Sequence, residues 1–131
     1  MPISVPNFEN PMLNRVAQGD MSIFEEGHDF TLTERKGRGD WDALDWNALR
    51  VAATMGYLDL VNALLEIATV RAHAAAEYNS ALIWAAGNGH LEVVNRLLEI
   101  DTVRANVTAE DNSALRWAAG NGHLEVVNRL L

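Results

Sequence analysis

The strongest constraint on the fold is that the last twenty residues of the chain occur twice. Residues 79–98 read NSALIWAAGNGHLEVVNRLL and residues 112–131 read NSALRWAAGNGHLEVVNRLL, so that only Ile83 and Arg116 differ. Residues 46–65 form a third, more divergent copy, identical to the second at ten of twenty positions. The period of 33 residues between the copies predicts a solenoid, because each short unit buries its apolar face only by stacking on its neighbours.

Each copy is predicted to form two short helices joined by a tight turn. Three residues that can cap a helix through their side chains open the copies: Asn47, Ser80 and Ser113. Three glycines stand where a left-handed residue would end the first helix: Gly56, Gly89 and Gly122. In the second helix of the middle copy, Leu91, Val94 and Leu97 recur on one face, as in an amphipathic helix that packs on a core.

The sequence Ala-Ala-x-x-Gly-His-Leu-Glu-Val-Val at Ala85–Val94, the Leu-Leu ending that follows it and the 33-residue period resemble the ankyrin repeat. The resemblance covers residues 45–131. It implies an all-α solenoid of stacked helix-turn-helix repeats that binds another protein through its first helices and its finger loops. The usual Asp-Val-Asn tip of the finger is replaced by Val-Arg-Ala at residues 70–72 and 103–105. In this respect the repeats are similar to those of ankyrin proteins that intracellular bacteria deliver into host cells.

The two segments between the copies are predicted to form short helical fingers rather than hairpins. The first segment, TVRAHAAAEY, is rich in helix-forming residues and contains no Gly or Pro. In the equivalent segment TVRANVTAE, the preceding Asp101 stands where it can cap a helix. Helical turns are therefore expected at residues 69–76 and 102–109, and Val70 and Val103 are expected to pack against the repeats.

The chain is predicted to consist of an N-terminal part, residues 1–44, and three repeats, residues 45–77, 78–110 and the incomplete 111–131. Within the first part, matching Gly19 to Gly56 gives a weak alignment, which indicates a degenerate capping repeat followed by a longer loop. The alignment places four apolar residues on core positions: Met12, Val16, Met21 and Phe24. Because the last repeat stops before its finger, it is expected to fray or to self-associate, and the chain is expected to be a fragment or to have an unusual end.

Composition disfavours several kinds of partner. The chain has 18 acidic and 10 basic residues and a formal charge of -8, which disfavours nucleic acid because no excess of cations exists to neutralise phosphates. It has no cysteine, and its N-terminus lacks the charge pattern and the apolar run of a signal or an anchor. We therefore expect no membrane association and a cytoplasmic location, or delivery into a host cell cytosol if the resemblance to the bacterial proteins holds.

No catalytic, metal or cofactor site is predicted. Ser80 and Ser113 have no base nearby in the sequence pattern, and helix capping already explains them. His90 and His123 share one register, but stacked repeats would separate them by roughly 10 Å, which is too far for one metal ion. These histidines are interpreted as residues of the repeat frame.

By the resemblance, the partner-binding positions lie on the first helices and near the fingers. They are Trp46, Arg50, Thr54, Met55, Asn79, Ile83, Asn88, Asn112, Arg116 and Asn121. Trp84 and Trp117 share a further register on the first helices. Rings at such a register either anchor a ligand or, as is more usual, pack between the repeats.

The register of Arg50, Ile83 and Arg116 is predicted to be exposed, because a buried site could not accept Ile in one copy and a guanidinium in the next without several kcal/mol of desolvation. Such a row would receive an acidic or aromatic segment, unless the exchange is neutral drift at a solvated site. The predicted function is a protein–protein interaction scaffold. The alternative is a targeting or spacer module of a larger effector whose catalytic domain lies beyond Leu131.

Overall fold

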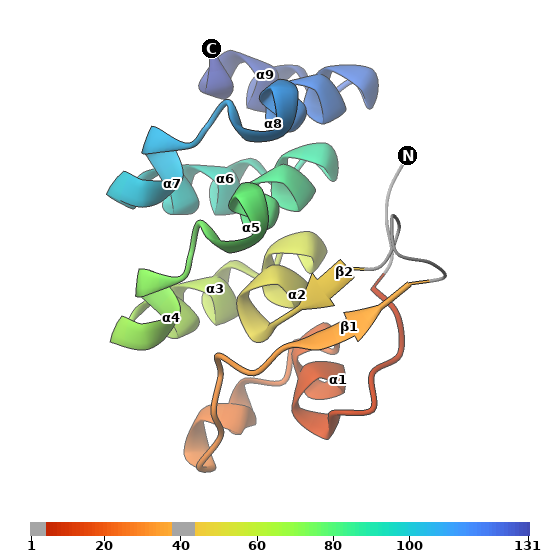
Figure 1. The fold of residues 1–131 in the computed structure, drawn as a ribbon, viewed down its shortest axis with the longest axis vertical. Helices are drawn as coiled ribbons and strands as arrows, with labels where there is room; N and C mark the ends of the chain where they lie inside the picture. The colour runs from red at the N-terminus through yellow and green to blue at the C-terminus, as the bar shows by residue number, and fades with distance from the viewer. Residues whose placement is uncertain (1–4, 38–43) are drawn as a thin grey trace.

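The chain forms a stack of helical layers in sequence order. The computed structural model describes residues 5–37 and 44–131. The first layer contains α1 (Pro11–Ala17) and the 3-10 helix η1 (Met21–Glu25), and three helix pairs follow it: α2 (Ala48–Met55) with α3 (Leu58–Leu65), α5 (Ala76–Gly87) with α6 (Leu91–Leu98), and α8 (Ala109–Gly120) with α9 (Leu124–Leu130). Figure 1 shows the layers following one another from the red end of the molecule to the blue end. The predicted all-α solenoid is confirmed.

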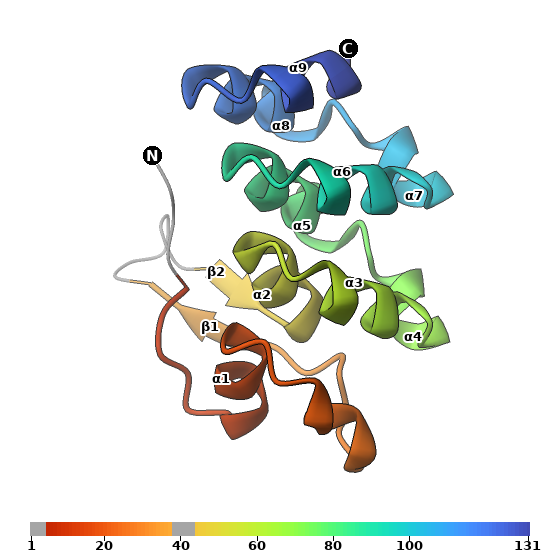
Figure 2. The ribbon, with the colours of Figure 1, turned by 180° about the vertical axis from the view of Figure 1, so that it is seen from behind.

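The helices of each pair occupy opposite faces of the stack. The first helices, α2, α5 and α8, lie toward the viewer in Figure 1, whereas the second helices, α3, α6 and α9, lie toward the viewer in Figure 2. Leu60, Val61, Leu64 and Leu65 of α3 are buried, as are Val93, Val94, Leu97 and Leu98 of α6. The core therefore runs between the two rows of helices and through every layer, as the apolar pattern predicted.

A two-stranded antiparallel sheet links the first layer to the helix pairs. It is formed by β1 (Glu34–Lys36) and β2 (Leu44–Trp46), with Glu34 opposite Trp46. The Glu34 carboxylate accepts hydrogen bonds from the backbone N–H groups of Glu9 and Asn10, both at 2.8 Å, so β1 also holds the segment before α1. The sequence did not predict this sheet, because three-residue strands are too short to produce an alternating pattern.

The predicted helix starts are correct for one of the three repeats. The Asn47 side chain accepts a hydrogen bond from the Arg50 N–H at 2.8 Å and caps α2. Ser80 and Ser113 do not cap a helix, since they lie within α5 and α8, which begin four residues earlier. The preceding residues, Asn79 and Asn112, adopt φ values of 68° and 66°, in the left-handed region that Asn tolerates better than most residues. The chain thus turns at an asparagine, and the helix-forming residues before it make an extra helical turn.

The fingers are helical, as predicted. They are α4 (Ala68–Ala72) and α7 (Asp101–Ala105), which project on the same side of the stack (Figure 1). Val70 and Val103 are both buried, which confirms that they pack. Asp101 lies in the first turn of α7, where it pairs with Arg104, instead of capping the helix.

An arginine fixes each finger to the helix before it. The Arg71 guanidinium donates to the Leu65 carbonyl at 2.8 Å, and the Arg104 guanidinium donates to the Leu98 carbonyl at 2.8 Å. These carbonyls lie at the C-terminal ends of α3 and α6, where the last four carbonyl groups of a helix have no partner within the helix. The same contact therefore closes both second helices and positions both fingers.

The N-terminal layer supports the first helix pair. Met12 and Val16 are buried, and α1 packs against α2. The prediction that Met21 lies in the core is wrong, because its side chain is 44% exposed and Ile23 is buried instead. The reason is that η1 is a 3-10 helix with three residues per turn, which shifts the buried register relative to an α-helix. Phe24 is half-buried and contacts the ring of Phe30.

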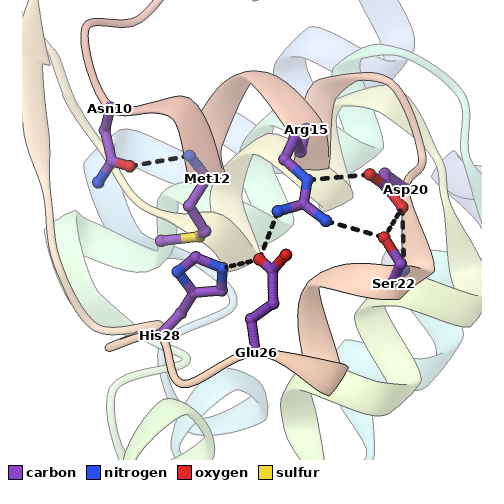
Figure 3. A network of polar contacts seen from close by, with 7 residues as sticks. All are labelled: Asn10, Met12, Arg15, Asp20, Ser22, Glu26 and His28. Carbon is purple, nitrogen blue, oxygen red and sulfur yellow. Dashed lines mark hydrogen bonds and ion pairs between the residues drawn. The ribbon is translucent and has the colours of Figure 1, made fainter.

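A polar network fixes η1 and the loop after it to α1 (Figure 3). The Arg15 guanidinium pairs with Asp20 at 2.9 Å and with Glu26, and it donates to the Ser22 hydroxyl at 2.8 Å. His28 contacts the same Glu26 carboxylate at 2.7 Å. Hydrogen bonds from the Ser22 hydroxyl and then from Arg15 lower the pKa of Asp20 from 3.8 to about 2, and the contact with Arg15 lowers the pKa of Glu26.

Acid is expected to loosen this layer. Because the pKa of Asp20 is lower in the folded chain than its ordinary value, its contribution is fully present above pH 3.8 and is lost as the pH falls through about 2. Urea unfolding at steps from pH 5 to pH 2 should therefore show stability falling more steeply in the native chain than in Asp20→Asn. Equal slopes in the two proteins would show that the network does not hold the layer in solution.

Candidate partner-binding surface

We call the face formed by α2, α5, α8 and the fingers α4 and α7 the first-helix face (Figure 1). The ten candidate residues lie within α2, α5 and α8 or within two residues of these helices in the chain. The structure does not expose them equally. Arg116 is exposed, whereas Met55, Ile83, Asn88, Asn112 and Asn121 are half-buried. The other four, Trp46, Arg50, Thr54 and Asn79, are buried.

The prediction that the Arg50 register is exposed is wrong for Arg50 itself, which is 5% exposed. Its guanidinium lies 4.7 Å from the ring centre of Trp46 and 5.4 Å from that of Trp84, and it donates to the Asp45 carbonyl at 2.8 Å. Two aromatic faces and a carbonyl oxygen thus replace part of the water that an exposed guanidinium would bind. Trp84 comes from the following repeat, so the burial of Arg50 depends in part on its neighbour in the stack.

Trp46, Thr54 and Asn79 are buried and make contacts within the chain, so little of each side chain is accessible to a partner. Trp46 packs between the rings of Phe8 and Trp84, and the Thr54 hydroxyl donates to the Arg50 carbonyl at 2.7 Å.

Asn79 connects its repeat to the next finger. The side-chain amide, 1% exposed, donates to the Val103 and Asn106 carbonyls at 2.9 Å and 3.2 Å. Both acceptors belong to α7 or to its C-terminal end. Asn79 therefore fixes the position of the second finger relative to α5.

The half-buried asparagines also join successive repeats. The Asn88 side chain donates to the Trp84 carbonyl at 3.0 Å and to the Thr54 carbonyl of the preceding repeat at 3.4 Å. The Asn121 side chain donates to the Gly87 carbonyl at 2.7 Å. In both cases the amide nitrogen binds a backbone carbonyl of the preceding repeat and helps to hold the two repeats together. Only part of each side chain faces solvent.

The substitution Asn79→Ala is expected to destabilise the chain by about 2 kcal/mol. It removes two hydrogen bonds, worth about 1 kcal/mol each, and places alanine in the left-handed region at a cost of about 1 kcal/mol. Loss of the buried Asn79 Oδ1, which has no hydrogen-bond partner in the described part of the chain, offsets part of this cost. Asn112→Ala is the control, because Asn112 has nearly the same φ but no following finger within residues 5–37 and 44–131, and it should cost about 1 kcal/mol or less. Urea unfolding would contradict this account if the two variants lost equal stability.

Three tryptophans form a row across the layers. The ring centres of Trp46 and Trp84 are 6.1 Å apart and those of Trp84 and Trp117 are 6.5 Å apart, with an interplanar angle of 31° in both pairs. The interpretation that Trp84 and Trp117 pack between repeats is therefore correct. Trp117 nevertheless remains 44% exposed, so part of its surface is open to a ligand.

A pocket that the sequence did not predict opens between the finger α4 and the loop after η1. Its volume is about 210 Å³, and it is lined by Phe30, Thr31, Thr33, Asn47, Leu49, Val70, His73 and Ala76. The loop residues have no equivalent in the other repeats, and Asn106 takes the place of His73 in the next repeat, so the repeat pattern contains no signal for this pocket. The lining of the pocket combines apolar and polar side chains beside the finger.

The described residues offer no arrangement typical of a metal site or a membrane span. Within residues 5–37 and 44–131, no three His, Cys, Asp or Glu side chains lie close enough together to hold a metal ion. None of the helices in the same ranges has the length and the apolar character needed to cross a bilayer.

Comparison with known proteins identifies the family. The family model for ankyrin repeats matches residues 49–131 in three copies. The structure of an ankyrin repeat family protein from Legionella pneumophila is similar, with 45% sequence identity and a TM-score of 0.57, over 64% of this chain and 26% of that one. The chain thus spans about a quarter of the length of that protein, and no curated protein matches it. Because the ankyrin model matches more than half of the residues, the chain belongs to the ankyrin repeat family.

Proposed function

We propose that this chain is a protein–protein interaction scaffold that binds a segment of another protein on its first-helix face and fingers. Ankyrin repeats are generally protein–protein interaction modules. The observation that carries the proposal is the pocket beside the finger α4, which is lined by Val70 of that finger and by His73 at its C-terminal end. No catalytic role is assigned to any residue.

The pocket suits one anchoring side chain. Its volume of about 210 Å³ is smaller than the roughly 300–1,000 Å³ of pockets that enclose a small molecule. Phe30, Leu49 and Val70 provide apolar contact, and the threonines and His73 provide polar groups at the edge. An apolar side chain inserted in such a pocket is the usual form of a binding hot spot.

A second contact is provided further along the same face. Arg116 is exposed, and Ile83 and Trp117 keep part of their surface open to solvent. An acidic or aromatic partner segment would meet a guanidinium there, in a chain whose charge is otherwise negative. The partner is therefore expected to combine an apolar anchor for the pocket with an acidic or aromatic group near Arg116.

We also propose how the chain is divided and where in the cell it acts. Residues 1–44 act as a capping unit and loop, and the repeats occupy residues 45–77, 78–110 and 111–131. Burial of Met12 and Val16 beneath α2 supports the capping role. Action in the cytoplasm, or in the cytosol of a host cell after delivery, is supported by the likeness to a Legionella protein of the same family.

Affinity capture with matched variants tests this function. Thr31→Arg places a long side chain at an exposed residue that lines the pocket, whereas Gln18→Arg adds the same charge at an exposed site beside the Gly56 turn. A protein retained by the native chain and by Gln18→Arg should bind Thr31→Arg about thirtyfold more weakly, because a hot-spot contact is worth about 2 kcal/mol. Equal retention by both variants would contradict the proposed role of the pocket.

A further inference from the structure

We propose that the pocket beside α4 binds a tyrosine side chain of the partner, with the ring among the apolar lining residues and the hydroxyl group in a smaller polar recess. The tyrosine site rests on the proposed function, because it is the same pocket and names the residue of the partner that enters it. Two adjoining cavities support it, together with the hydrogen-bonding groups that lie where the cavities meet.

The recess is a second cavity next to the pocket. Its volume is about 10 Å³, which is the room that one water molecule needs, so it has space for a single oxygen atom. The pocket and the recess share four lining residues: Asn47, Leu49, His73 and Ala76. The recess is also lined by three polar residues that do not line the pocket: Asp45, Arg50 and Ser80. A side chain with an apolar body and a polar tip would therefore fill both cavities.

His73 provides a hydrogen-bond acceptor at the junction of the two cavities. Its Nδ1 lies 2.8 Å from the Thr69 carbonyl oxygen, which can only accept, so in the neutral ring Nδ1 carries the proton and Nε2 is an acceptor. Nε2 has no hydrogen-bond partner in the part of the chain that the structure describes. Asn106 has the same register in the next repeat, and its side chain donates to the Thr102 carbonyl at 2.7 Å. Asparagine thus suffices for the contact within a finger, and histidine adds the acceptor Nε2.

Asn47 provides a donor at the same junction. Its Oδ1 accepts the hydrogen bond of 2.8 Å from the Arg50 N–H that caps α2, which leaves the amide nitrogen Nδ2 for another contact. Nδ2 donates to none of the residues that the structure describes. The side chains of Asn47 and His73 are each held to the backbone by one polar atom. A donor and an acceptor are therefore fixed beside the recess before any partner binds.

These groups select among the side chains that a partner could insert. The apolar lining, formed by Phe30, Leu49 and Val70, requires an apolar body. The tip must accept from Asn47 Nδ2 and donate to His73 Nε2, and a hydroxyl group does both. Phenylalanine and leucine would leave both groups unpaired, whereas lysine and tryptophan offer only donors. Tyrosine combines a large ring with a hydroxyl group that both donates and accepts.

Analogues of side chains test this preference in the absence of a partner. Nuclear magnetic resonance titrations of the 131-residue chain would use p-cresol for tyrosine, toluene for phenylalanine, and 4-methylanisole, whose oxygen carries a methyl group in place of the proton. We expect p-cresol to shift the amide signals of the lining residues and to bind about tenfold more tightly than toluene, because two neutral hydrogen bonds contribute about threefold each. 4-Methylanisole should bind no more tightly than toluene, since it cannot donate to His73.

Two variants assign the preference to the junction. His73→Asn keeps a nitrogen in the position of Nδ1 but has no atom in that of Nε2, and Asn106 shows that a finger accommodates this side chain. Asn47→Ser keeps a residue that caps helices well but removes the amide donor. Each variant should lower the preference for p-cresol over toluene about threefold, the contribution of one hydrogen bond, and should leave the affinity for toluene unchanged.

Three results would overturn the tyrosine site. They are p-cresol that does not bind or binds no more tightly than toluene, a preference that is unchanged in either variant, and signal shifts confined to residues outside the pocket and the recess. None of them decides the proposed function, because another anchor could still enter the pocket and the pair Thr31→Arg and Gln18→Arg tests that separately. Conversely, equal retention of a partner by that pair would contradict the proposed function even if p-cresol bound as expected.

Discussion

Gly56→Ala is expected to destabilise the chain by about 4 kcal/mol, the largest effect of any substitution considered. The φ of Gly56 is 78°, where alanine costs about 1 kcal/mol more than glycine. The new methyl group would lie 2.4 Å from His90 Nδ1, so the ring must move. Overpacking in a core contact costs about 1–3 kcal/mol, and the displaced ring would lose the hydrogen bond of its Nε2 to the Thr54 carbonyl, 3.0 Å long and worth about 1 kcal/mol.

Gly122→Ala is the matched control for this result. Gly122 has a φ of 77°, and no described atom lies within 4 Å of the position of its Cβ. Only the backbone cost remains, and about 1 kcal/mol is expected. Urea unfolding of both variants measures the difference. If Gly122→Ala were as destabilising as Gly56→Ala, the loss would arise from the backbone alone, and the ring would not contribute to stacking.

Arg50→Ala is expected to cost about 3 kcal/mol. The change removes cation–π contacts with two rings, worth about 1 kcal/mol each when partly desolvated, a charged hydrogen bond to the Asp45 carbonyl, and the packing of the long side chain between Trp46 and Trp84. Lower desolvation of the variant offsets some of this loss.

Arg116→Ala provides the comparison, because it makes the same change in the same register at an exposed site. Its effect should not exceed about 0.5 kcal/mol, as for other surface substitutions. Arg50→Lys should restore only part of the lost stability, since an ammonium does not stack flat on two rings. Equal stability of Arg50→Ala and Arg116→Ala would show that the rings do not hold Arg50 in solution.

The sequence predicted the parts of the fold that every repeat contains. The left-handed glycines, the apolar stripe of the second helices and the burial of Val70 and Val103 all recur with the 33-residue period, so each is specified more than once. The helical fingers followed from local propensity, because their residues favour a helix and no glycine interrupts them.

Other features depend on neighbours that a repeat pattern does not contain. Arg50 and Arg116 share a register, but only Arg50 has a following repeat that places a tryptophan over it. The exchange of Arg for Ile between copies was interpreted as a sign that the whole register is exposed. The exposure instead differs from repeat to repeat, because each residue has different neighbours in the stack. The pocket likewise needs Phe30, which comes from a segment that is not repeated, and His73, whose register holds Asn106 in the next repeat.

Ser80 shows how two residues can compete for one role. Serine is a strong N-cap residue, but Asn79 before it tolerates the left-handed conformation and also binds the next finger through its amide. Helix α5 runs from Ala76 to Gly87, and the left-handed residue lies within it, one residue before the expected cap. The identical pair at Asn112 and Ser113 repeats this geometry.

Hydrogen exchange of the chain alone and with a captured partner protein tests the central claim most directly. If the chain binds a partner on its first-helix face, amides in α4, α5, α7 and α8 should exchange more slowly in the complex, while those on the exposed side of α3 and α6 should not change. Protection confined to α3 and α6, with unchanged exchange at the fingers and first helices, would contradict the account.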